Sequence, residues 1–113
     1  MGNFPEDDLQ MSVARYLDAL GLLWNHCANE RKTTKIKGGR LKKKGVKSGV
    51  PDCMIYEAKN GYNGLAIELK IRKGTVSDNQ KEWLKRLSEK GWSTHVCYNL
   101  DEVIREVKFY LET

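Results

Sequence analysis

The sequence predicts an α/β fold, in which a mixed sheet is flanked by helices in the order α-β-β-β-α-β-α. A chain of 113 residues with 40% hydrophobic residues can bury one core but not two. Apolar residues recur at helical spacing in several stretches, and they alternate with polar residues over residues 65–71. A helix separates the last two expected strands, which implies a parallel pair joined by a right-handed crossover. We therefore expect a single domain over residues 1–113.

The first half of the chain predicts a helix, a strand and a long loop. Apolar residues at helical spacing over residues 6–20 precede Gly21, which stands where a C-terminal cap would. Residues 22–27 contain no breaker and are typical of a short strand. The stretch 28–49 is rich in Gly and Lys and has no periodicity, so we expect it to be a loop, or alternatively a mobile hairpin, inserted into the domain.

Two further strands are expected around a turn. Pro51 ends the loop, and residues 52–58 are typical of a strand. Turn residues follow between Asn60 and Gly64. The alternation over residues 65–71 predicts that one face of the third strand is apolar and that the other carries Ala66, Glu68 and Lys70.

The last third of the chain predicts a helix, a strand and a helix. Ser77 and Gln80 form the pattern of a capping box, and the helix they open stops at Gly91. Residues 93–98 are expected to form the fourth strand. Asn99 can then cap a final helix that carries a regular apolar stripe.

The net charge of +5 is very unevenly distributed along the chain. Residues 31–51 hold nine basic residues and no acid, whereas the rest of the chain carries 11 basic and 15 acidic residues. A concentrated basic run favours a phosphate-rich partner, although a solvated loop would have the same composition. The nine candidate nucleic-acid-binding residues are Arg31, Lys32, Lys35, Lys37, Arg40, Lys42, Lys43, Lys44 and Lys47.

Cysteine usage and hydropathy exclude several classes of protein. Cys27, Cys53 and Cys97 are odd in number, widely spaced and set in apolar segments, so we expect free thiols rather than disulfides or a zinc site. No window approaches the roughly 20 apolar residues that a membrane span needs. The acidic N-terminus lacks the order of a signal peptide, so we expect an intracellular protein with no membrane partner.

Two acids and a lysine are predicted to meet at one end of the sheet. If residues 52–58 and 65–71 pair antiparallel, Asp52 and Lys70 lie at the same open end of the ladder. Neighbouring carboxylates repel unless a cation lies between them, and hard oxygen ligands suit Mg²⁺ or Mn²⁺. A nearby lysine can orient or deprotonate water, or offset charge on a phosphate. The alternative is a Glu68–Lys70 surface pair worth about 0–1 kcal/mol.

Three side chains on the predicted helices add to this hypothesis. Glu6 lies on the apolar stripe of the first helix, so its side chain is expected to face the sheet rather than water. Gln10 and Gln80 also lie on or near core-facing stripes. Each has a simpler explanation, because Glu6 also suits the positive end of a helix and Gln80 can merely complete its capping box.

Two short runs resemble the PD-(D/E)xK nuclease superfamily, and within it the virus-type replication-repair nuclease (VRR-NUC) domain. In these runs a proline and an aspartate enter one strand, and Glu-x-Lys lies on the next. They read Ser48-Gly49-Val50-Pro51-Asp52 and Ala66-Ile67-Glu68-Leu69-Lys70. The resemblance extends over nearly the whole chain through a further set of matching positions: Glu6, Gln10, Tyr16, Leu17, Gly21, Ser77 and Gln80. It implies a restriction-endonuclease-like core.

The resemblance also implies roles for individual residues. It implies a site for Mg²⁺ or Mn²⁺ formed by Glu6, Asp52, Glu68 and the backbone carbonyl of Leu69. Asp7 and Asp8 compete with Glu6 for the place of the helix acid. Lys70 would assist the attacking water, and Gln80 would position water, the lysine or the backbone. The implied catalytic set is therefore Asp52, Glu68, Lys70 and Gln80.

Small stand-alone members of this family, often encoded by phages, imply a metal-dependent endonuclease that acts as a homodimer on branched DNA such as four-way (Holliday) junctions. A phage protein of this kind would act in the cytoplasm of its bacterial host. The basic run from Arg31 to Lys47 departs from the family pattern. Two alternatives remain open, which are a non-cleaving nucleic-acid-binding module of the same fold and a basic RNA-binding protein.

Overall fold

A computed structural model describes residues 5–27, 39–40, 42–72 and 74–112. It contains one four-stranded sheet with the strand order β1-β2-β3-β4. The predicted element order α-β-β-β-α-β-α is confirmed, and so is the mixed sheet. The elements are α1 (Pro5–Ala19), β1 (Trp24–His26), β2 (Cys53–Ile55), β3 (Gly64–Leu69), α3 (Asp78–Glu89), β4 (Trp92–Cys97) and α4 (Leu100–Glu112).

The pairing of the strands brings the two sequence motifs together. β1 and β3 both pair antiparallel with β2, and β4 pairs parallel with β3. Cys53 lies opposite Ile67, so the residue that precedes β2 lies beside the end of β3. The connection between β2 and β3 contains a tight turn in which Asn60 and Gly61 have φ angles of 54° and 80°. An Asn-Gly pair adopts these left-handed angles readily, as two-residue hairpin turns require.

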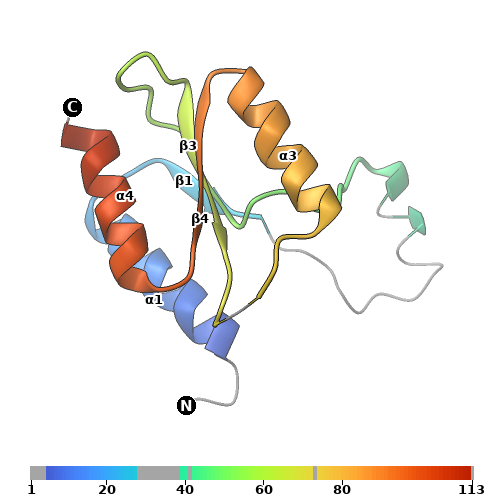
Figure 1. The fold of residues 1–113 in the computed structure, drawn as a ribbon, viewed down its shortest axis with the longest axis horizontal. Helices are drawn as coiled ribbons and strands as arrows, with labels where there is room; N and C mark the ends of the chain where they lie inside the picture. The colour runs from blue at the N-terminus through green and yellow to red at the C-terminus, as the bar shows by residue number, and fades with distance from the viewer. Residues whose placement is uncertain (1–4, 28–38, 41, 73, 113) are drawn as a thin grey trace.

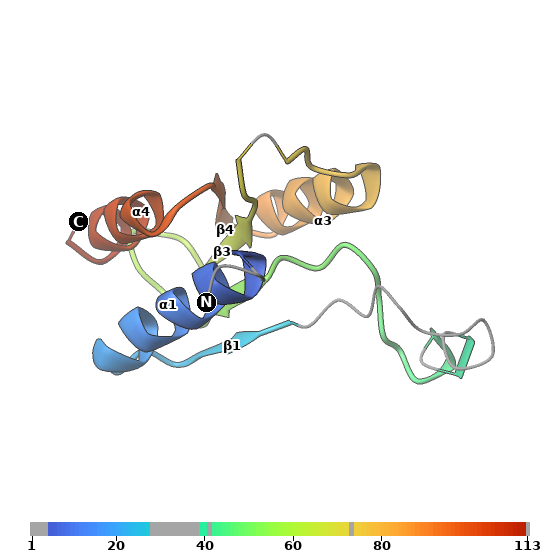
Figure 2. The same cartoon turned by 90° about the horizontal axis from the view of Figure 1, so that it is seen from below.

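Helices cover both faces of the sheet (Figures 1 and 2). α1 and α4 lie on one face, where Val13, Leu17, Val103 and Val107 pack against inward-facing residues of β2, β3 and β4. α3 lies on the other face, where Leu87 packs in a smaller cluster with residues of β2 and β3. Both faces of β3 are therefore buried, because the polar face predicted from its alternation lies beneath α3.

The strands are shorter than predicted because neighbouring backbone groups have other partners. The N–H of Leu22 donates to the carbonyl of Leu17 and so belongs to the end of α1. The N–H of Asn63 donates to Gly91 over 2.8 Å, which ends the β2–β3 ladder early. Arg72 has a left-handed φ of 47°, which is incompatible with continuing β3.

The stretch 28–49, predicted as a loop or a hairpin, contains a short helical turn in its second half. Residues 39–40 and 42–43 are helical, and the N–H of Lys44 donates to the carbonyl of Arg40 over 3.1 Å. Lysine and arginine are good helix formers, which explains this short turn. It ends before Gly45, whose φ is 96°.

Both predicted helix caps are confirmed. The Ser77 hydroxyl accepts a hydrogen bond from the Gln80 N–H, and the Gln80 side chain accepts one from the Ser77 N–H. At α4, Asn99 Oδ1 accepts from the N–H of Glu102 over 2.8 Å. All three cysteines are free thiols. Among the described residues, no helix is long and apolar enough to cross a membrane.

Gly49 joins residues 42–48, which we call the basic segment, to the start of β2 and lies directly against α3. Its φ is 89°, and a Cβ built on it would lie 2.7–2.8 Å from backbone and Cβ atoms of Asn79. The neighbouring Ser48 hydroxyl accepts a 2.8 Å hydrogen bond from Asn79 Nδ2. Segment 48–52 is thereby held against the N-terminal turn of α3.

Gly49→Ala is expected to lower the free energy of unfolding by more than about 2 kcal/mol, because it combines a strained φ with a clash against backbone atoms. Gly45→Ala is the matched control, since its φ of 96° is similarly left-handed but no atom of the described residues lies within 4 Å of its Cβ position. Urea unfolding measures both variants. Equal losses of stability would show that the contact with α3 is not tight.

Candidate active site at one end of the sheet

Asp52 is fixed by backbone groups of both neighbouring strands. Its Oδ2 accepts a hydrogen bond from the N–H of Leu69 over 2.8 Å. Its backbone carbonyl accepts a 2.8 Å hydrogen bond from the N–H of Cys27 and lies 2.8 Å from Nδ1 of His26. These contacts hold the half-buried carboxylate at the end of β3, where the antiparallel pairing predicted it.

Glu68 is the most deeply buried charged group of the site. It lies on the α3 face of β3, and only 1% of its surface is exposed. Its Oε2 accepts a 2.8 Å hydrogen bond from Gln80 Nε2 and lies 3.5 Å from Lys70 Nζ. Its Oε1 is buried and accepts no hydrogen bond from a donor group within the described part of the chain, while the Glu68 and Asp52 carboxyls can hydrogen-bond to each other only by sharing a proton. A buried carboxylate oxygen without a partner is costly unless a ligand satisfies it.

Gln80 connects the cap of α3 to this carboxylate. Its Oε1 accepts the Ser77 N–H over 2.8 Å, so its amide group is oriented with Nε2 toward Glu68. Gln80 therefore completes the capping box and also holds one oxygen of Glu68. The simpler explanation from the sequence, a role in the cap alone, accounts for its contacts with Ser77 but not for its hydrogen bond to Glu68.

The contacts of Lys70 exclude a solvated ion pair. Its side chain lies under α3 with the residue 8% exposed, and its ammonium group contacts the buried Glu68. The alternative of a Glu68–Lys70 surface pair is therefore wrong. The structure brings Asp52, Glu68, Lys70 and Gln80 together as the sequence predicted, while their catalytic roles stay predictions.

Burial makes both carboxylates of the site reluctant to ionise. Burial, reinforced by the neighbouring Asp52 charge, raises the pKa of Glu68 to about 7, although Lys70 acts in the opposite direction. Burial also raises the pKa of Asp52, against the opposing effect of its hydrogen bond from Leu69. A carboxylate pair with raised pKa values is stabilised by an added cation, which favours its charged form.

The metal-free protein is expected to lose stability as the pH rises. The folded pKa of Glu68, about 7, lies above its ordinary value of 4.5, so the folded state binds this proton more tightly than the unfolded state does. The contribution of Glu68 to stability is therefore complete below about pH 4.5 and is lost as the pH rises through 7, by at most about 3 kcal/mol.

Urea unfolding in EDTA, repeated across this pH range, measures the effect. Glu68→Gln is the control, because it removes the titration and can still accept the Gln80 hydrogen bond. Its stability should depend less steeply on pH than that of the wild type. Parallel profiles for the two proteins would contradict the raised pKa of Glu68.

Glu6, the acid predicted from the first helix, is more exposed than Asp52 and Glu68. Glu6 is exposed in the first turn of α1, so the expectation that its side chain faces the sheet is wrong, as suits a charge near a helix N-terminus. Asp7 is exposed, whereas Asp8 is half-buried. Gln10 does face the sheet, with Nε2 3.7 Å from Cys53 Sγ. In the described ranges, no three His, Cys, Asp or Glu side chains gather closely enough to hold a metal ion.

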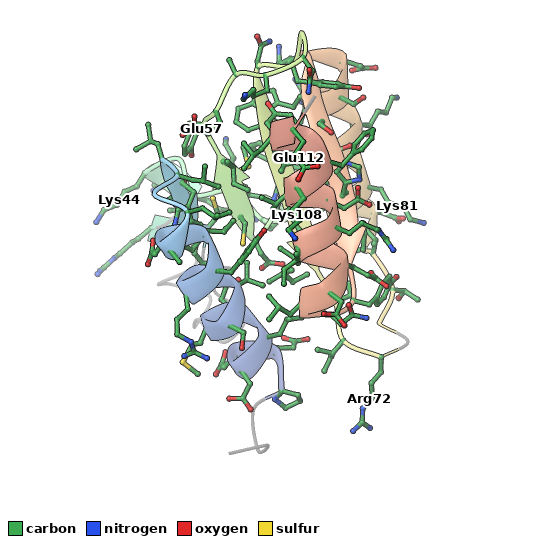
Figure 3. The ribbon with its side chains drawn as sticks, turned by 90° about the vertical axis from the view of Figure 1, so that its left-hand side faces the viewer. Lys44, Glu57, Arg72, Lys81, Lys108 and Glu112 are labelled. Carbon is green, nitrogen blue, oxygen red and sulfur yellow. The ribbon has the colours of Figure 1, made fainter. Side chains whose placement is uncertain are left out.

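α1 nevertheless begins at the end of the molecule that carries the site. Figure 3 shows Arg72, which follows β3, at the same end as the start of α1. Glu6 as a metal ligand therefore stays a prediction, as does the backbone carbonyl of Leu69.

The basic residues are only partly within the described ranges. Arg40, Lys42, Lys43, Lys44 and Lys47 are all exposed. The segment that carries them extends from the sheet past the N-terminal end of α3 (Figure 1). The other four predicted nucleic-acid-binding residues, Arg31, Lys32, Lys35 and Lys37, lie outside the described residues.

Sequence reasoning missed His26 as a neighbour of the site. Nδ1 of His26 contacts the backbone of Asp52, and the histidine opposes the rise in the pKa of that carboxyl. The signal was available, because the antiparallel pairing of β1 with β2 places the end of one strand beside the start of the other.

The chemistry of the donor set fits a hard divalent cation. Asp52 and Glu68 offer carboxylate oxygens, and one of these is buried without a donor partner among the described residues. Mg²⁺ is commonly held by one or two carboxylates together with water and substrate phosphates, so a pair suffices. Burial raises the pKa of the Cys27, Cys53 and Cys97 thiols, which disfavours the thiolate form that soft metals bind.

A mixed sheet that brings two acids and a lysine together beneath a capped helix defines the PD-(D/E)xK class of nuclease folds. The family model of the VRR-NUC domain matches residues 6–99. The chain therefore belongs to the VRR-NUC family, which is a family of nucleases.

Two known proteins support this assignment. A solved structure described as a VRR_NUC domain protein superposes with a TM-score of 0.76 at 25% identity, covering 99% of this chain and 92% of that one. The Fanconi-associated nuclease 1 homolog of Arabidopsis thaliana is 38% identical over 53 residues. That match covers 44% of this chain but only 6% of the Arabidopsis protein, so the similarity concerns a small part of that protein.

Proposed function

We propose that this chain is a divalent-metal-dependent endonuclease that hydrolyses phosphodiester bonds in branched DNA, including four-way (Holliday) junctions. The observation that carries the proposal is the buried Glu68 Oε1, which has no donor partner among the described residues and lies in a group with Asp52 and Lys70. Without a ligand this oxygen relies on a proton shared with the neighbouring Asp52 carboxyl, and a divalent cation bound between the two carboxylates would replace that proton. Membership of a nuclease family supports the same reaction.

Asp52 and Glu68 would hold Mg²⁺ or Mn²⁺, with the Leu69 carbonyl and Glu6 as further ligands. When bound, the cation would neutralise charge on the scissile phosphate and lower the pKa of a water molecule, so that the water loses a proton and the resulting hydroxide can attack phosphorus. Gln80 keeps Glu68 Oε2 occupied, which leaves Oε1 for the ligand. The hydrogen bond from Leu69 orients Asp52 in the same way.

Lys70 would act on the reacting phosphate. Its ammonium group is buried beside Glu68, so its charge is poorly screened and acts strongly on nearby groups. It would orient the attacking water and stabilise the negative charge that develops on the phosphate oxygens. Removing this charge should therefore affect the rate more than DNA binding.

The small size of the chain favours recognition of DNA shape. A domain of 113 residues has little surface for reading bases beside an active site, so phosphate contacts would dominate. In a homodimer, two such sites related by symmetry would cut two strands of one junction. A phage-encoded chain of this kind would act in the cytoplasm of a bacterial host.

The basic segment is expected to contribute to DNA affinity. Replacing Lys42, Lys43 and Lys44 with Ala should weaken DNA binding and reduce the slope of log K against log salt by about 2–3, because each lost phosphate contact removes about 0.9. A gel-shift titration at several salt concentrations measures this slope.

The matched control is Arg15→Ala with Lys59→Ala and Lys108→Ala, which lowers the net charge equally. All three residues are exposed and lie outside the basic segment, and Figure 3 shows Lys108 on α4. Equal slopes for the two triple variants would mean that the segment attracts DNA only through net charge.

The experiment that tests the proposed substrate compares linear, flap, splayed and four-way DNA with RNA of equal length. Each is incubated with the purified protein and Mg²⁺ or Mn²⁺, and the mass of the protein is measured in solution. The proposal predicts preferred cleavage of branched DNA by a dimer. Binding without cleavage would support a non-cleaving module, and preferred RNA binding would support an RNA-binding protein.

A further inference from the structure

A groove with an aromatic floor lies between the basic segment and one flank of α3. It consists of two hollows of about 360 and 380 Å³, and both are lined by Lys47, Glu82 and Trp83. We call this feature the Trp83 groove. None of these three residues belongs to the predicted active site, and the Glu-x-Lys motif does not require them.

The two walls of the Trp83 groove are joined to each other by direct contacts. One side is α3 itself, and the other is the segment that ends at Ser48 and Gly49. The Ser48–Asn79 hydrogen bond and the close approach of Gly49 to Asn79 join the two. The groove therefore exists before any ligand binds, which reduces the entropic cost of binding.

Trp83 is anchored and accessible at the same time. Its side chain packs against the cluster of Met54, Ala66 and Leu87, yet it also lines both hollows. An indole held by core packing presents a rigid flat surface. Such surfaces stack on nucleic-acid bases and tolerate any base, because every base has an aromatic face.

The rim of the groove carries an excess of positive charge. Lys42 and Lys47 contribute from the basic segment, and Arg86 and the C-cap residue Lys90 contribute from α3 and its end. Among the described lining residues, Glu82 is the only acid. All four cations are exposed. An aromatic floor with a cationic rim matches the chemistry of a nucleotide, whose flat base is flanked by phosphates.

The groove lies one helical turn from the predicted active site. Gln80, which contacts Glu68, precedes Trp83 by three residues on α3, so the two side chains project from the same side of the helix. The rise of the helix separates them by only about 4.5 Å along its axis. A strand whose phosphate reached Glu68 would pass close to Trp83.

We propose that the Trp83 groove binds an unpaired nucleotide of single-stranded DNA, with its base stacked on Trp83 and its flanking phosphates on Lys47 and Arg86. This subsite deepens the proposed function, on which it rests for its role in selecting substrates. An unpaired base exists at flaps and splayed ends, and at a junction where base pairs open at the branch point, but not within an intact duplex. Recognition of that base would give selectivity for branched DNA without reading sequence.

The test measures binding of a fluorescent 12-nucleotide single strand and of a duplex of equal length in EDTA, so that cleavage plays no part. Trp83→Leu should weaken single-strand binding about 5- to 150-fold, while Trp83→Phe should retain most of the affinity. The effect on the duplex should be much smaller. Unchanged single-strand affinity in Trp83→Leu, or an equal loss in Trp83→Phe, would overturn the proposal.

A second pair of variants guards against a folding defect in Trp83→Leu. Arg86→Ala with Lys90→Ala removes two rim charges, and Lys81→Ala with Lys85→Ala removes two exposed charges of α3 that do not line the groove. The rim pair should reduce the salt slope of single-strand binding by about 1.4 and the control pair by clearly less. Equal reductions would also overturn the proposal.

The two proposals fail in different ways. Absence of cleavage with either metal would remove the proposed nuclease function but leave single-strand binding in EDTA unaffected. If the Trp83 variants bound single-stranded DNA like the wild type while the protein still cut DNA, only the proposed nucleotide subsite would be refuted.

Discussion

Replacing Asp52 with Asn is expected to lower the rate of metal-dependent DNA cleavage by about 10²- to 10³-fold or more. The substitution keeps the size of the side chain and an oxygen that can accept the Leu69 hydrogen bond, but it removes the negative charge. The carboxylate pair would then attract a divalent cation far less strongly. DNA binding should persist, because the basic segment is unchanged.

Cleavage of labelled DNA under single-turnover conditions with Mn²⁺ measures the rate, and a gel shift in EDTA measures binding. Asp101→Asn is the matched control, because Asp101 is an exposed acid in the first turn of α4. The control should cut like the wild type. Cleavage by Asp52→Asn at more than a tenth of the wild-type rate would show that Asp52 is not part of the catalytic site.

Replacing Lys70 with Met is expected to reduce the cleavage rate about as severely while leaving metal binding in place. Methionine keeps the length and apolar stem of the lysine but removes the charge that would act on the phosphate. Glu68 would lose its ion pair with Lys70, whose charge lowers the pKa of Glu68, so that pKa should rise above about 7. Any residual activity should therefore shift to higher pH.

Single-turnover rates from pH 6 to 9 measure both effects, and calorimetric Mn²⁺ titration at pH 9 measures metal binding. Lys81→Met changes an exposed lysine of α3 and serves as the control. Wild-type cleavage by Lys70→Met would remove the lysine from the mechanism. A lost rate together with lost metal binding would instead assign Lys70 a role in holding the site together.

The sequence predicted the helices better than the strands because helix ends carry local chemical signals. Ser77, Gln80 and Asn99 cap their helices through contacts with residues at most three positions away, so the sequence alone specifies them. Strand ends depend on distant partners. The bond from Asn63 to Gly91 shortens the β2–β3 ladder, and nothing near Asn63 in the sequence indicates it.

The site was predictable to the extent that it follows from strand pairing. The antiparallel arrangement places Asp52 beside the end of β3, and alternation places Glu68 and Lys70 on one face. Burial of that face under α3 was not predictable, because its polar residues suggested exposure. The burial of Glu6 was predicted wrongly because helical periodicity identifies the face of α1 on which a residue lies but not how deeply the first turn of that helix is buried.

The most direct test of metal-dependent cleavage at the Asp52–Glu68 site is the cleavage rate of labelled four-way DNA as Mn²⁺ is titrated into metal-stripped protein. We expect no cleavage in EDTA and a rate that rises with Mn²⁺ to a plateau. Glu68→Gln should need far more Mn²⁺ or fail to cut, because the buried oxygen would no longer carry charge. Cleavage that persists in EDTA, or absence of cleavage by the wild type at any Mn²⁺ concentration, would contradict the account.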